Sequence, residues 1–372
     1  MRIAVNTRFL LNDKLEGIGW FTYEVVRRLV QAHPEHEFIF LFDRPYDAQF
    51  IFGENVTPVV LFPPARHPVL WLWWFEWSVP RALKKYRADV FLSPDGYCSL
   101  RASTPTVMVT HDIAHVHLPM HIPARFRYYY DFFVPRYLRR AERIVTVSEF
   151  SKRDIAQHYK IANEKIAVAC NGVREDFQPL SEAEKNAVKQ QYADGQDYFF
   201  YVGAVHPRKN VHRLIRAFDA FKKRTQAPAK LLIGGRFAWQ TGEVKAAYDA
   251  ADCKDDIVFL GYIPDAELPQ LMGAALALTY VSLFEGFGVP VLEAMHGDVP
   301  VLTSNVSSLP EVAGDAGLLV NPLDVEAIAS AMQQLYGNAA LREKLIATGN
   351  IQRQKFSWER AAEIVWEHLC NL

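Results

Sequence analysis

The sequence contains few cysteines and almost no net charge, and each shortage excludes a class of protein. Its four cysteines, Cys98, Cys170, Cys253 and Cys370, are far apart and form no CxxC pair. That spacing excludes a disulfide framework or a cysteine zinc site and indicates a reducing compartment. The 41 Lys and Arg against 42 Asp and Glu leave a formal net charge of -1. Because nucleic-acid binding depends on neutralising many phosphates, we expect no nucleic-acid partner.

Long apolar segments are also missing. The most apolar window, residues 69–75, is broken by Glu76 and is far too short to span a bilayer. The chain begins with a short apolar run and shows none of the parts of a signal peptide. We therefore expect a cytoplasmic protein, and a peripheral contact with the inner face of the membrane stays open.

What the sequence does contain is a regular alternation of short apolar runs and helical patterns. The expected strands are 2–6, 37–42, 56–61, 90–93, 106–110, 143–147, 198–202, 230–234, 257–260, 277–279, 299–303 and 317–320. The helical patterns include 20–32, 79–86, 210–225, 265–274, 289–296 and 325–336. The length of 372 residues suggests about two domains. Because such alternation implies parallel sheets covered on both faces, we predict an α/β fold with two doubly wound domains.

The loop after the first expected strand carries Gly17 and Gly19, just before a helix expected to start at Trp20. Paired glycines let a ligand approach the backbone N–H groups at the positive end of a helix. Thr22 stands where the dinucleotide fingerprint GxGxxG has its third glycine, which disfavours a nicotinamide or flavin site. A helix-start turn without a ligand stays the alternative.

Three histidines and an aspartate follow the fifth expected strand, at His111, Asp112, His115 and His117. Such residues can ligate a metal, but the spacing matches no HExxH pattern and no cysteine or glutamate is near. We therefore expect no metal site. His111 stands where the strand should stop, which makes it the better candidate to act at the ligand-binding edge. A loop histidine without a role is the other interpretation.

A basic pair follows the first strand of the second series. Gly203 leads to Arg208 and Lys209, which precede the helix expected at 210–225. Two cations beside the free N–H groups of a helix start form an anion site that suits a diphosphate. A solvated pair of charges is the alternative, which their place after a strand disfavours.

The most specific signal is a pair of glutamates, Glu285 and Glu293, eight residues apart in the segment SLFEGFGVPVLEAM. Gly286 and Gly288 leave backbone amides uncovered, and Pro290 fits the first turn of a helix. We expect both carboxylates to line one pocket, Glu285 from the loop and Glu293 from the helix. Carboxylates accept hydrogen bonds from sugar and ribose hydroxyls, and bare amides suit phosphate. A helix cap plus an ordinary surface glutamate is the alternative.

Together these features resemble the retaining group 1 (family 4) glycosyltransferases. The E-G-F-G-x-P-x-L-E segment, with its E-x7-E spacing, carries most of that resemblance, which covers nearly the whole chain. It extends to residues 17–19, 111–112, 147–151, 171–173, 202–203, 207–210 and 308–312. It implies the GT-B fold, in which two Rossmann-like domains face each other across a cleft. Residues 1–175 would form the acceptor domain, 176–354 the nucleotide-sugar domain, and 355–372 a helix that returns to the first domain.

The resemblance also implies roles for single residues. Glu293 would hold the ribose hydroxyls and Glu285 the sugar hydroxyls of the donor. Arg208 and Lys209 would neutralise the leaving diphosphate, and His111 would contact the donor sugar near the reacting carbon. The other donor-binding positions would be Gly17, Gly19, Gly203, Gly286, Phe287, Gly288 and Val289.

One position departs from the pattern of the family. Many members carry Arg directly after the glycine that corresponds to Gly203, and this chain has Ala204 there. We expect Arg208 to supply the missing charge.

The implied activity is metal-independent transfer of a hexose from a nucleotide sugar, with retention of the anomeric configuration and no cofactor besides the donor. The chain is most similar to bacterial mannosyltransferases of surface polysaccharide assembly, which favours GDP-mannose as donor and a lipid-linked saccharide as acceptor. We expect a same-face substitution assisted by the leaving phosphate, because no nearby carboxylate is placed as a nucleophile. A nucleotide-sugar epimerase, a transferase that uses a UDP- or dTDP-sugar, a binding module and a metal-dependent hydrolase are the alternatives.

Two stretches of the first half are candidates to contact the acceptor or the membrane. Residues 68–77 include Trp71, Trp73 and Trp74, and tryptophan can stack on sugars or lie at a membrane interface. Residues 125–140 mix aromatic side chains with arginines such as Arg125 and Arg127. A basic, aromatic helix can lie on an anionic membrane. Domain core with a solvated face is the alternative for both stretches.

Overall fold

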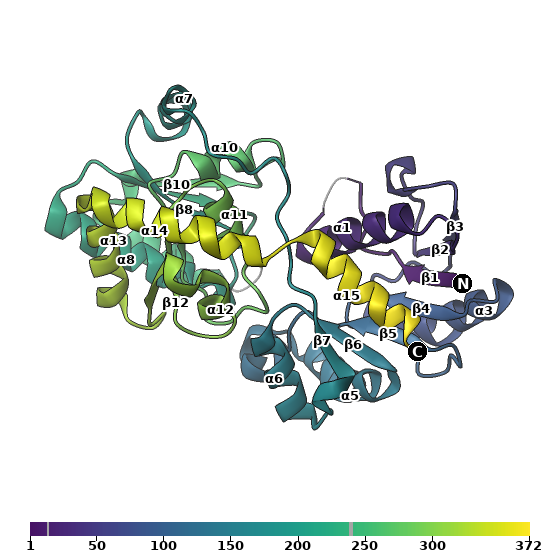
Figure 1. Ribbon diagram of the computed structural model, residues 1–372. Coiled ribbons are helices and arrows are strands. Elements are labelled where there is room, and N and C mark those ends of the chain that lie inside the picture. The colour runs from purple at the N-terminus through teal and green to yellow at the C-terminus, as the bar shows by residue number, and fades with distance from the viewer. Residues whose placement is uncertain (13–14, 238–240) are drawn as a thin grey trace. The chain divides into compact units, whose positions relative to one another are not determined.

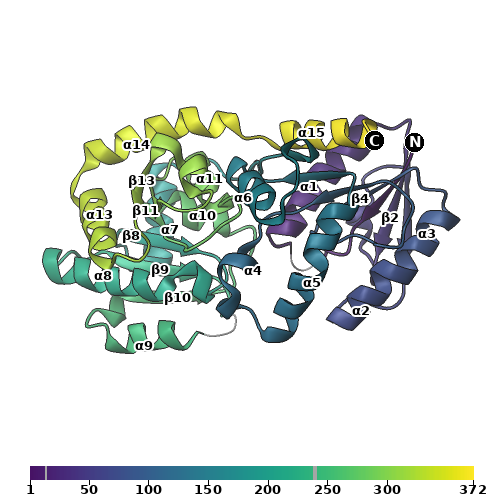
Figure 2. The ribbon, with the colours of Figure 1, turned by 90° about the horizontal axis from the view of Figure 1, so that it is seen from below.

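The chain forms two compact units, each of which is described by itself. The computed structural model describes residues 1–12, 15–237 and 241–372, and it leaves the side chain of Arg125 undescribed. Unit 1 contains Met1–Gly172 and Ser357–Leu372, and unit 2 contains Val173–Phe356. Figures 1 and 2 show the elements of both units from two directions.

Unit 1 is built on a parallel sheet. Its strands are β1 (Arg2–Asn6), β2 (Glu37–Phe42), β3 (Val56–Val60), β4 (Val90–Ser93), β5 (Thr106–Val109), β6 (Arg143–Thr146) and β7 (Ile166–Val168). Within the described residues their order is β3-β2-β1-β4-β5-β6-β7, with parallel neighbours throughout. β2 reads EFIFLF and is buried after its first residue, as a parallel strand covered on both faces must be. The strand order reverses between β1 and β4, and such a reversal is where doubly wound sheets bind ligands.

Helices cover both faces of this sheet. They are α1 (Gly17–Ala32), α2 (Pro68–Trp73), α3 (Val79–Lys85), α4 (Ala114–His117), α5 (Ala124–Arg140), α6 (Glu149–Tyr159) and the C-terminal α15 (Trp358–Cys370). α15 lies along α1 in both views (Figures 1 and 2), although more than 300 residues separate them in the sequence. An ion pair of 2.7 Å between Arg28 Nη2 and Glu359 Oε1 joins the two helices. The last residues of the chain therefore belong to the unit that its first residues form.

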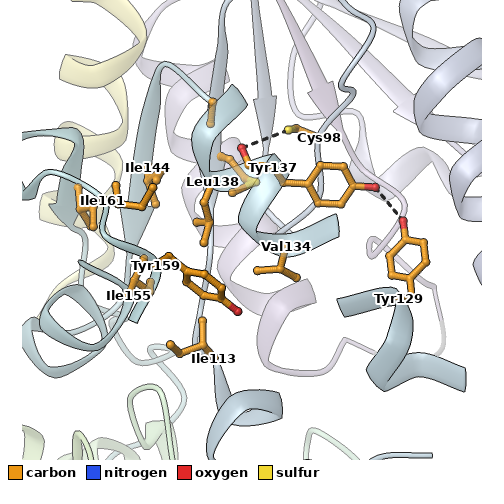
Figure 3. Packing of buried hydrophobic residues seen from close by; sticks show 13 residues of the cluster. Cys98, Ile113, Tyr129, Val134, Tyr137, Leu138, Ile144, Ile155, Tyr159 and Ile161 are labelled. Carbon is orange, nitrogen blue, oxygen red and sulfur yellow. Dashed lines mark hydrogen bonds between the residues drawn. The ribbon is translucent and has the colours of Figure 1, made fainter. Parts of the chain in front are cut away.

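One face of α5 belongs to the core of unit 1 (Figure 3). Tyr129, Tyr137 and Leu138 are buried there beside residues such as Ile113 and Ile144. The hydroxyls of Tyr129 and Tyr137 point toward each other and form a hydrogen bond of 2.8 Å. This pairing lets two polar groups lie in an apolar core without the cost of an unsatisfied donor. Part of the aromatic run at 125–140 is therefore packing rather than surface.

Unit 2 repeats the doubly wound plan. Its strands are β8 (Tyr198–Val202), β9 (Lys230–Gly234), β10 (Ile257–Gly261), β11 (Ala277–Tyr280), β12 (Val301–Ser304) and β13 (Gly317–Val320). Its helices are α7 (Glu182–Ala193), α8 (Val211–Thr225), α9 (Gly242–Ala250), α10 (Leu268–Gly273), α11 (Val289–His296), α12 (Leu309–Ala313), α13 (Val325–Gly337) and α14 (Ala339–Gln352). Within the described residues the strand order is β10-β9-β8-β11-β12-β13, and it reverses between β8 and β11. The two parallel doubly wound sheets that the sequence predicts are thus confirmed.

The first helix begins earlier than the sequence predicts. α1 starts at Gly17 rather than at Trp20, so Gly17 and Gly19 lie in its first turn and not in the preceding loop. A Cβ on Gly19 would come within 2.9 Å of the carbonyl oxygen of Phe9, whereas a Cβ on Gly17 would meet open space. Close packing therefore explains Gly19, and nothing in the packing requires Gly17.

Several other boundaries differ from the predicted ones. The helix predicted at 265–274 is only Leu268–Gly273, because Pro269 fits its first turn and fixes its start. α8 begins at Val211, since Asn210 adopts a left-handed backbone with φ of 62°. α14 was not predicted. Its buried residues are only Leu345, Gly349 and Gln352, and so few apolar positions give no helical pattern in the sequence. Among the described residues, no helix is both long and apolar enough to cross a membrane.

Candidate functional site

The loops after β8 and β11, at the point where the strand order of unit 2 reverses, bring together the most specific sequence signals. The loop after β8 carries Arg208 and Lys209 in a 3₁₀ turn, Pro207–Lys209. The loop after β11 carries Glu285. The backbone N–H of Leu283 donates to the carbonyl of Arg208 at 2.8 Å, so the two loops are bonded directly to each other. The predicted cations and carboxylate therefore meet where a doubly wound sheet binds its ligand.

Glu285 forms ion pairs with both cations. Its Oε1 lies 2.7 Å from Lys209 Nζ, and its Oε2 lies 3.3 Å from Arg208 Nη1. Burial by itself would raise the pKa of Glu285, but Arg208 and Lys209 outweigh that effect and lower the pKa to about 2. The carboxylate is therefore ionised throughout the physiological range. Both cations therefore lie beside the same carboxylate, and fixed cations favour an anionic ligand.

Side chains that the sequence did not single out hold this cluster in place. Arg208 Nη1 also donates to the carbonyl of Phe284 at 3.0 Å. Lys209 Nζ donates to the hydroxyl of Tyr280, the last residue of β11. Asn210 is fully buried, and its amide donates to the carbonyls of Val281 at 3.0 Å and Pro322 at 2.7 Å. An asparagine between a basic pair and a helix was the one sequence signal that could have found this anchor.

The glycine-rich loop after Glu285 is fixed by two serines that precede α12. The hydroxyl of Ser308 lies 2.9 Å from the carbonyl oxygen of Glu285 and 2.8 Å from that of Phe287. The Ser307 hydroxyl accepts from the Glu285 backbone N–H at 3.1 Å. Gly288 has a φ of 108°, and a Cβ there would lie 2.6 Å from the Leu309 side chain. Glycine at this position thus allows both the left-handed turn and the close approach of α12.

The remaining predicted donor positions of unit 2 lie in this loop, at the start of α11 and after β8. Gly203 follows β8 with a φ of 141°, and its N–H donates to the Gly234 carbonyl at 3.0 Å. Gly286 and Phe287 are buried in the loop itself, and Val289 is the first residue of α11. Ala204, which stands where the family pattern has Arg, is half-buried.

Glu293 has different charged neighbours from Glu285. It lies in α11 and is half-buried. Burial raises the pKa of its carboxyl to about 7; Arg174 opposes that shift, and Asp176 and Asp265 reinforce it. The two glutamates therefore differ in charge near neutral pH, with Glu285 ionised and Glu293 close to half-protonated. One carboxylate suits permanent hydrogen-bond acceptance, whereas the acceptance of the other depends on pH.

In unit 1, His111 lies two residues after the end of β5 and is neutral. Its Nε2 lies 2.9 Å from the carbonyl oxygen of Pro94, so Nε2 carries the proton and Nδ1 is left as an acceptor. Burial lowers the pKa of His111 and keeps the ring uncharged. Its ring packs edge-on against Phe21 of α1, with 5.1 Å between ring centroids.

The other two histidines of this segment turn to separate partners. His115 Nε2 lies 2.9 Å from the Tyr159 hydroxyl, and His117 Nε2 lies 2.8 Å from the Asp154 carboxylate. In the part of the chain that the structure describes, no three His, Cys, Asp or Glu side chains come together as metal ligands would.

Sequence reasoning missed a buried ion pair at the strand reversal of unit 1. Arg8, just after β1, pairs with Asp95, just after β4, and their side chains are only 5% and 1% exposed. Asn6 Nδ2 donates to the same carboxylate at 2.8 Å. The Arg8 guanidinium also lies over the Tyr97 ring, 4.6 Å from its centroid. An arginine two residues after the end of an apolar strand was the available signal.

The aromatic candidates of unit 1 divide between core and surface. Trp74 is fully buried, so the prediction that it contacts acceptor or membrane is wrong, because its ring fills the core beside Phe75. Trp71 is half-buried and donates its indole N–H to the Ala65 carbonyl at 2.7 Å. Trp73 is 52% exposed and stacks on Trp77.

The two arginine candidates lie in α5. Arg127 is half-buried, with its guanidinium 5.6 Å from the centroid of the Tyr128 ring. The side chain of Arg125 lies outside the described residues.

Comparisons with known proteins bear on the family and the fold of the chain. Residues 15–177 match the model of Glycosyltransferase Family 4, and residues 182–352 match that of Glycosyl transferases group 1. The O-antigen chain mannosyltransferase B of Escherichia coli is 33% identical over 93% of both chains. The O-antigen chain mannosyltransferase RfbU of Salmonella typhimurium is 29% identical over 72% of this chain and 71% of its own. Among solved structures, Anabaena Alr3699/HepE in complex with UDP and glucose superposes with a TM-score of 0.78 over 100% of this chain and 99% of its own, at 17% identity. That likeness shows the fold, which is the predicted GT-B type with two Rossmann-like domains.

Proposed function

The chain belongs to the family 4 (group 1) glycosyltransferases, and from that premise we propose that it transfers mannose from GDP-mannose to a saccharide of an O-antigen, with retention of the anomeric configuration. Two relatives that are named O-antigen chain mannosyltransferases support the sugar and the class of acceptor. The observation that carries the chemistry is the pairing of Arg208 and Lys209 with Glu285 at the strand reversal of unit 2.

The two cations suit the charge that develops on a leaving nucleoside diphosphate. When the bond between the sugar and the diphosphate breaks, negative charge builds on the phosphate oxygens, and fixed cations stabilise it without reorganisation. The side chains of Arg208 and Lys209 are 25% and 14% exposed, so a ligand can reach both while most of their surface stays out of water. Low hydration strengthens each interaction with the phosphate.

Glu285 takes the part of a hydrogen-bond acceptor for the donor sugar. With a pKa of about 2 it cannot act as a general acid at neutral pH. Its two ion pairs also make it a weak nucleophile, because attack would form a neutral ester and remove the negative charge that both cations stabilise. A same-face substitution, in which the leaving phosphate assists the incoming acceptor, fits these limits, and the chain needs no metal or further cofactor for it.

Glu293 and His111 complete the proposed donor contacts. Glu293 would accept hydrogen bonds from the ribose hydroxyls in its ionised form, which its pKa of about 7 makes available at neutral and alkaline pH. Neutral His111 would offer Nδ1 as an acceptor to a hydroxyl of the donor sugar near the reacting carbon.

A surface of unit 1 fits a lipid-linked acceptor at an anionic membrane. Phe62 is 82% exposed and Trp73 is 52% exposed, and both border a hollow of about 600 Å³ that Arg81 and Lys85 also line. Exposed aromatic side chains beside cations are typical of surfaces that lie at the headgroup level of a bilayer. We therefore include the inner membrane surface among the partners, with the protein on the cytoplasmic side.

A donor and acceptor assay tests the proposal. The protein is incubated with GDP-mannose, a UDP-sugar or a dTDP-sugar, with and without a lipid-linked mannose acceptor and with a chelator present. We expect transfer from GDP-mannose that needs the acceptor and ignores the chelator, with retained configuration in the NMR spectrum of the product. An isomerised sugar and free nucleotide without acceptor would instead indicate an epimerase. Transfer from a UDP- or dTDP-sugar alone would overturn the donor assignment.

A further inference from the structure

Tyr280, the last residue of β11, connects two opposite charges of the unit 2 cluster. Its hydroxyl accepts a hydrogen bond from Lys209 Nζ and donates one to Glu285 Oε1 at 3.2 Å. Lys209 Nζ also donates to the same carboxylate oxygen at 2.7 Å. The three side chains therefore form a closed triangle of hydrogen bonds inside one unit.

The chemistry of the three groups sets the direction of each bond. An ammonium has only donors and an ionised carboxylate has only acceptors, so the hydroxyl must accept from Lys209 and donate to Glu285. Burial and the Glu285 carboxylate raise the pKa of Tyr280 well above its usual range, so the hydroxyl keeps its proton. Tyr280 is thus a neutral bridge between a cation and an anion at any physiological pH.

The Tyr280 side chain itself is tightly packed. It is 2% exposed, and its ring stacks on Tyr201 of β8, with centroids 6.2 Å apart and an interplanar angle of 21°. The Tyr280 carbonyl accepts from the hydroxyl of Thr303 on β12 at 2.7 Å. Lys209 Nζ lies 4.9 Å from the centroid of the Tyr280 ring, so ring and hydroxyl both contact the ammonium. A group on a packed strand is placed more precisely than one on a loop.

We propose that Tyr280 is a positioning residue whose hydroxyl keeps the Lys209 ammonium in place for the diphosphate while Glu285 accepts hydrogen bonds from the donor sugar. The inference rests on the proposed function, since it takes Lys209 as a phosphate contact and Glu285 as the acceptor for sugar hydroxyls. Lys209 and Glu285 are bonded to each other in the structure, and a bound donor competes for both. Tyr280 acts through Lys209 and needs no contact of its own with the ligand.

The physical reason is the freedom of a lysine side chain. Its ammonium ends a flexible four-carbon stem, so a fixed partner is needed to keep the charge in one place. Glu285 shares its acceptor oxygens with the sugar in the proposed complex, whereas the Tyr280 hydroxyl stays available to Lys209. Groups that are in position before the bond breaks stabilise the developing charge without reorganisation. Loss of the hydroxyl should therefore lower kcat more than it changes the KM for the donor.

The test replaces Tyr280 with phenylalanine, which keeps the ring, its stacking and its contact with the ammonium. Tyr280→Phe should lower kcat for transfer from GDP-mannose about 10- to 100-fold, the cost of one hydrogen bond to a charged group. The KM for GDP-mannose should change less than about threefold. Steady-state kinetics with a saturating acceptor gives both quantities.

The stacked partner of Tyr280 offers a matched control. Tyr201 is also buried, but its hydroxyl donates to the Ala204 carbonyl at 3.4 Å and, within the described residues, bonds to neither Lys209 nor Glu285. Tyr201→Phe should keep kcat within about twofold of wild type, because a long bond between neutral groups contributes little. Melting temperatures verify that both variants fold. Equal losses of kcat in the two variants would overturn the inference, since the tyrosines would then support the site by packing alone.

A double variant shows whether Tyr280 acts through Lys209. In a Lys209→Met background, Tyr280→Phe should change the rate less than about twofold, because no ammonium is left to position. Product formed in long incubations and measured by mass spectrometry gives both rates. A loss as large as in the wild-type background would overturn the inference, because the hydroxyl would then act independently of Lys209.

The wild type separates a failure of this inference from a failure of the proposed function. An active wild type with a Tyr280→Phe variant whose kcat stays within about twofold of it contradicts the inference alone. A wild type that transfers no sugar contradicts the proposed function, and this inference with it.

Discussion

In unit 2 the two predicted cations converge on one carboxylate, whereas in unit 1 the predicted residues turn to separate partners. Arg208, Lys209 and Glu285 form a single ion-paired cluster between two loops. His111 bonds to a backbone carbonyl, and Trp74 fills the core. The difference shows which signals in a sequence report function. Opposite charges that follow neighbouring strands lie close enough to form ion pairs. Aromatic side chains, by contrast, occur both in the core and at the surface, so their presence alone does not indicate function.

The largest expected effect separates the tryptophans of unit 1. Trp74→Ala should lower the free energy of unfolding by about 3–5 kcal/mol, because it leaves a large cavity in the core. The matched variant Trp73→Ala removes a half-exposed ring and should cost less than about 1 kcal/mol. Urea denaturation measures both. Equal losses would mean that the division between core and surface in this stretch is wrong.

The next effect concerns the cations of unit 2. Lys209→Met should lower kcat by about 100- to 1000-fold, the usual cost of removing one fixed group that stabilises developing charge. The control is Lys245→Met, since Lys245 is 77% exposed on α9 of the same unit. Steady-state kinetics with a saturating acceptor gives the ratio. A loss below threefold for Lys209→Met would contradict the catalytic role of the cluster, which would then be structural only.

A smaller effect distinguishes Glu293 from Glu285 by pH. If ionised Glu293 holds the ribose, the affinity for GDP should rise about tenfold between pH 6 and pH 8, as a carboxyl with a pKa of about 7 loses its proton. The affinity of Glu293→Gln should lack this component, so the ratio of the two variants isolates it from the titration of GDP itself. Calorimetric titrations at several pH values give that ratio, and a constant ratio would remove Glu293 from the site.

The same shift predicts the sign of the stability change. The folded-state pKa of Glu293 lies above the ordinary value of 4.5, so its protonated form favours the folded state. That contribution is complete below about pH 4.5 and is lost as the pH rises through about 7. Glu293→Gln should therefore gain stability relative to wild type on going from pH 6 to pH 8, by about 1–2 kcal/mol.

The smallest effect tests the paired glycines of α1. Gly19→Ala should cost about 1 kcal/mol, because its Cβ would meet the Phe9 carbonyl at 2.9 Å. Gly17→Ala has open space around its Cβ and should change stability by less than about 0.5 kcal/mol. Full activity of Gly17→Ala would contradict the ligand role predicted for Gly17. A large loss of kcat without loss of stability would support that role.

The sequence predicts the fold better than it predicts the geometry of the site. Short apolar runs such as EFIFLF at 37–42, rich in aromatic and branched residues, are typical of strands buried on both faces, so the pattern predicts the two parallel sheets. The start of α1 was misplaced because glycine disfavours a helix interior, whereas the buried Gly19 is required by its packing.

The sequence marked the charged residues of the unit 2 site, but it did not show which partner each side chain of the two units would reach. The spacing of Glu285 and Glu293 marked both carboxylates, but it did not show that Arg208 and Lys209 pair with only one of them. Ser308 and Asn210 fix the loops through backbone carbonyls, and no pattern of residue types shows which carbonyl a side chain will reach. The Arg8–Asp95 pair joins residues far apart in the sequence and needed the strand order to be seen.

The central claim is that the cations of unit 2 form a metal-independent site for a guanosine diphosphate. The most direct measurement is a calorimetric titration of GDP, UDP, ADP and dTDP into the wild type and Lys209→Met with a chelator present. The account predicts that GDP binds the wild type most tightly and that Lys209→Met weakens it at least about tenfold, as loss of a charge-assisted phosphate contact should. Failure of every nucleoside diphosphate to bind, or equal binding of GDP by wild type and Lys209→Met, would contradict it.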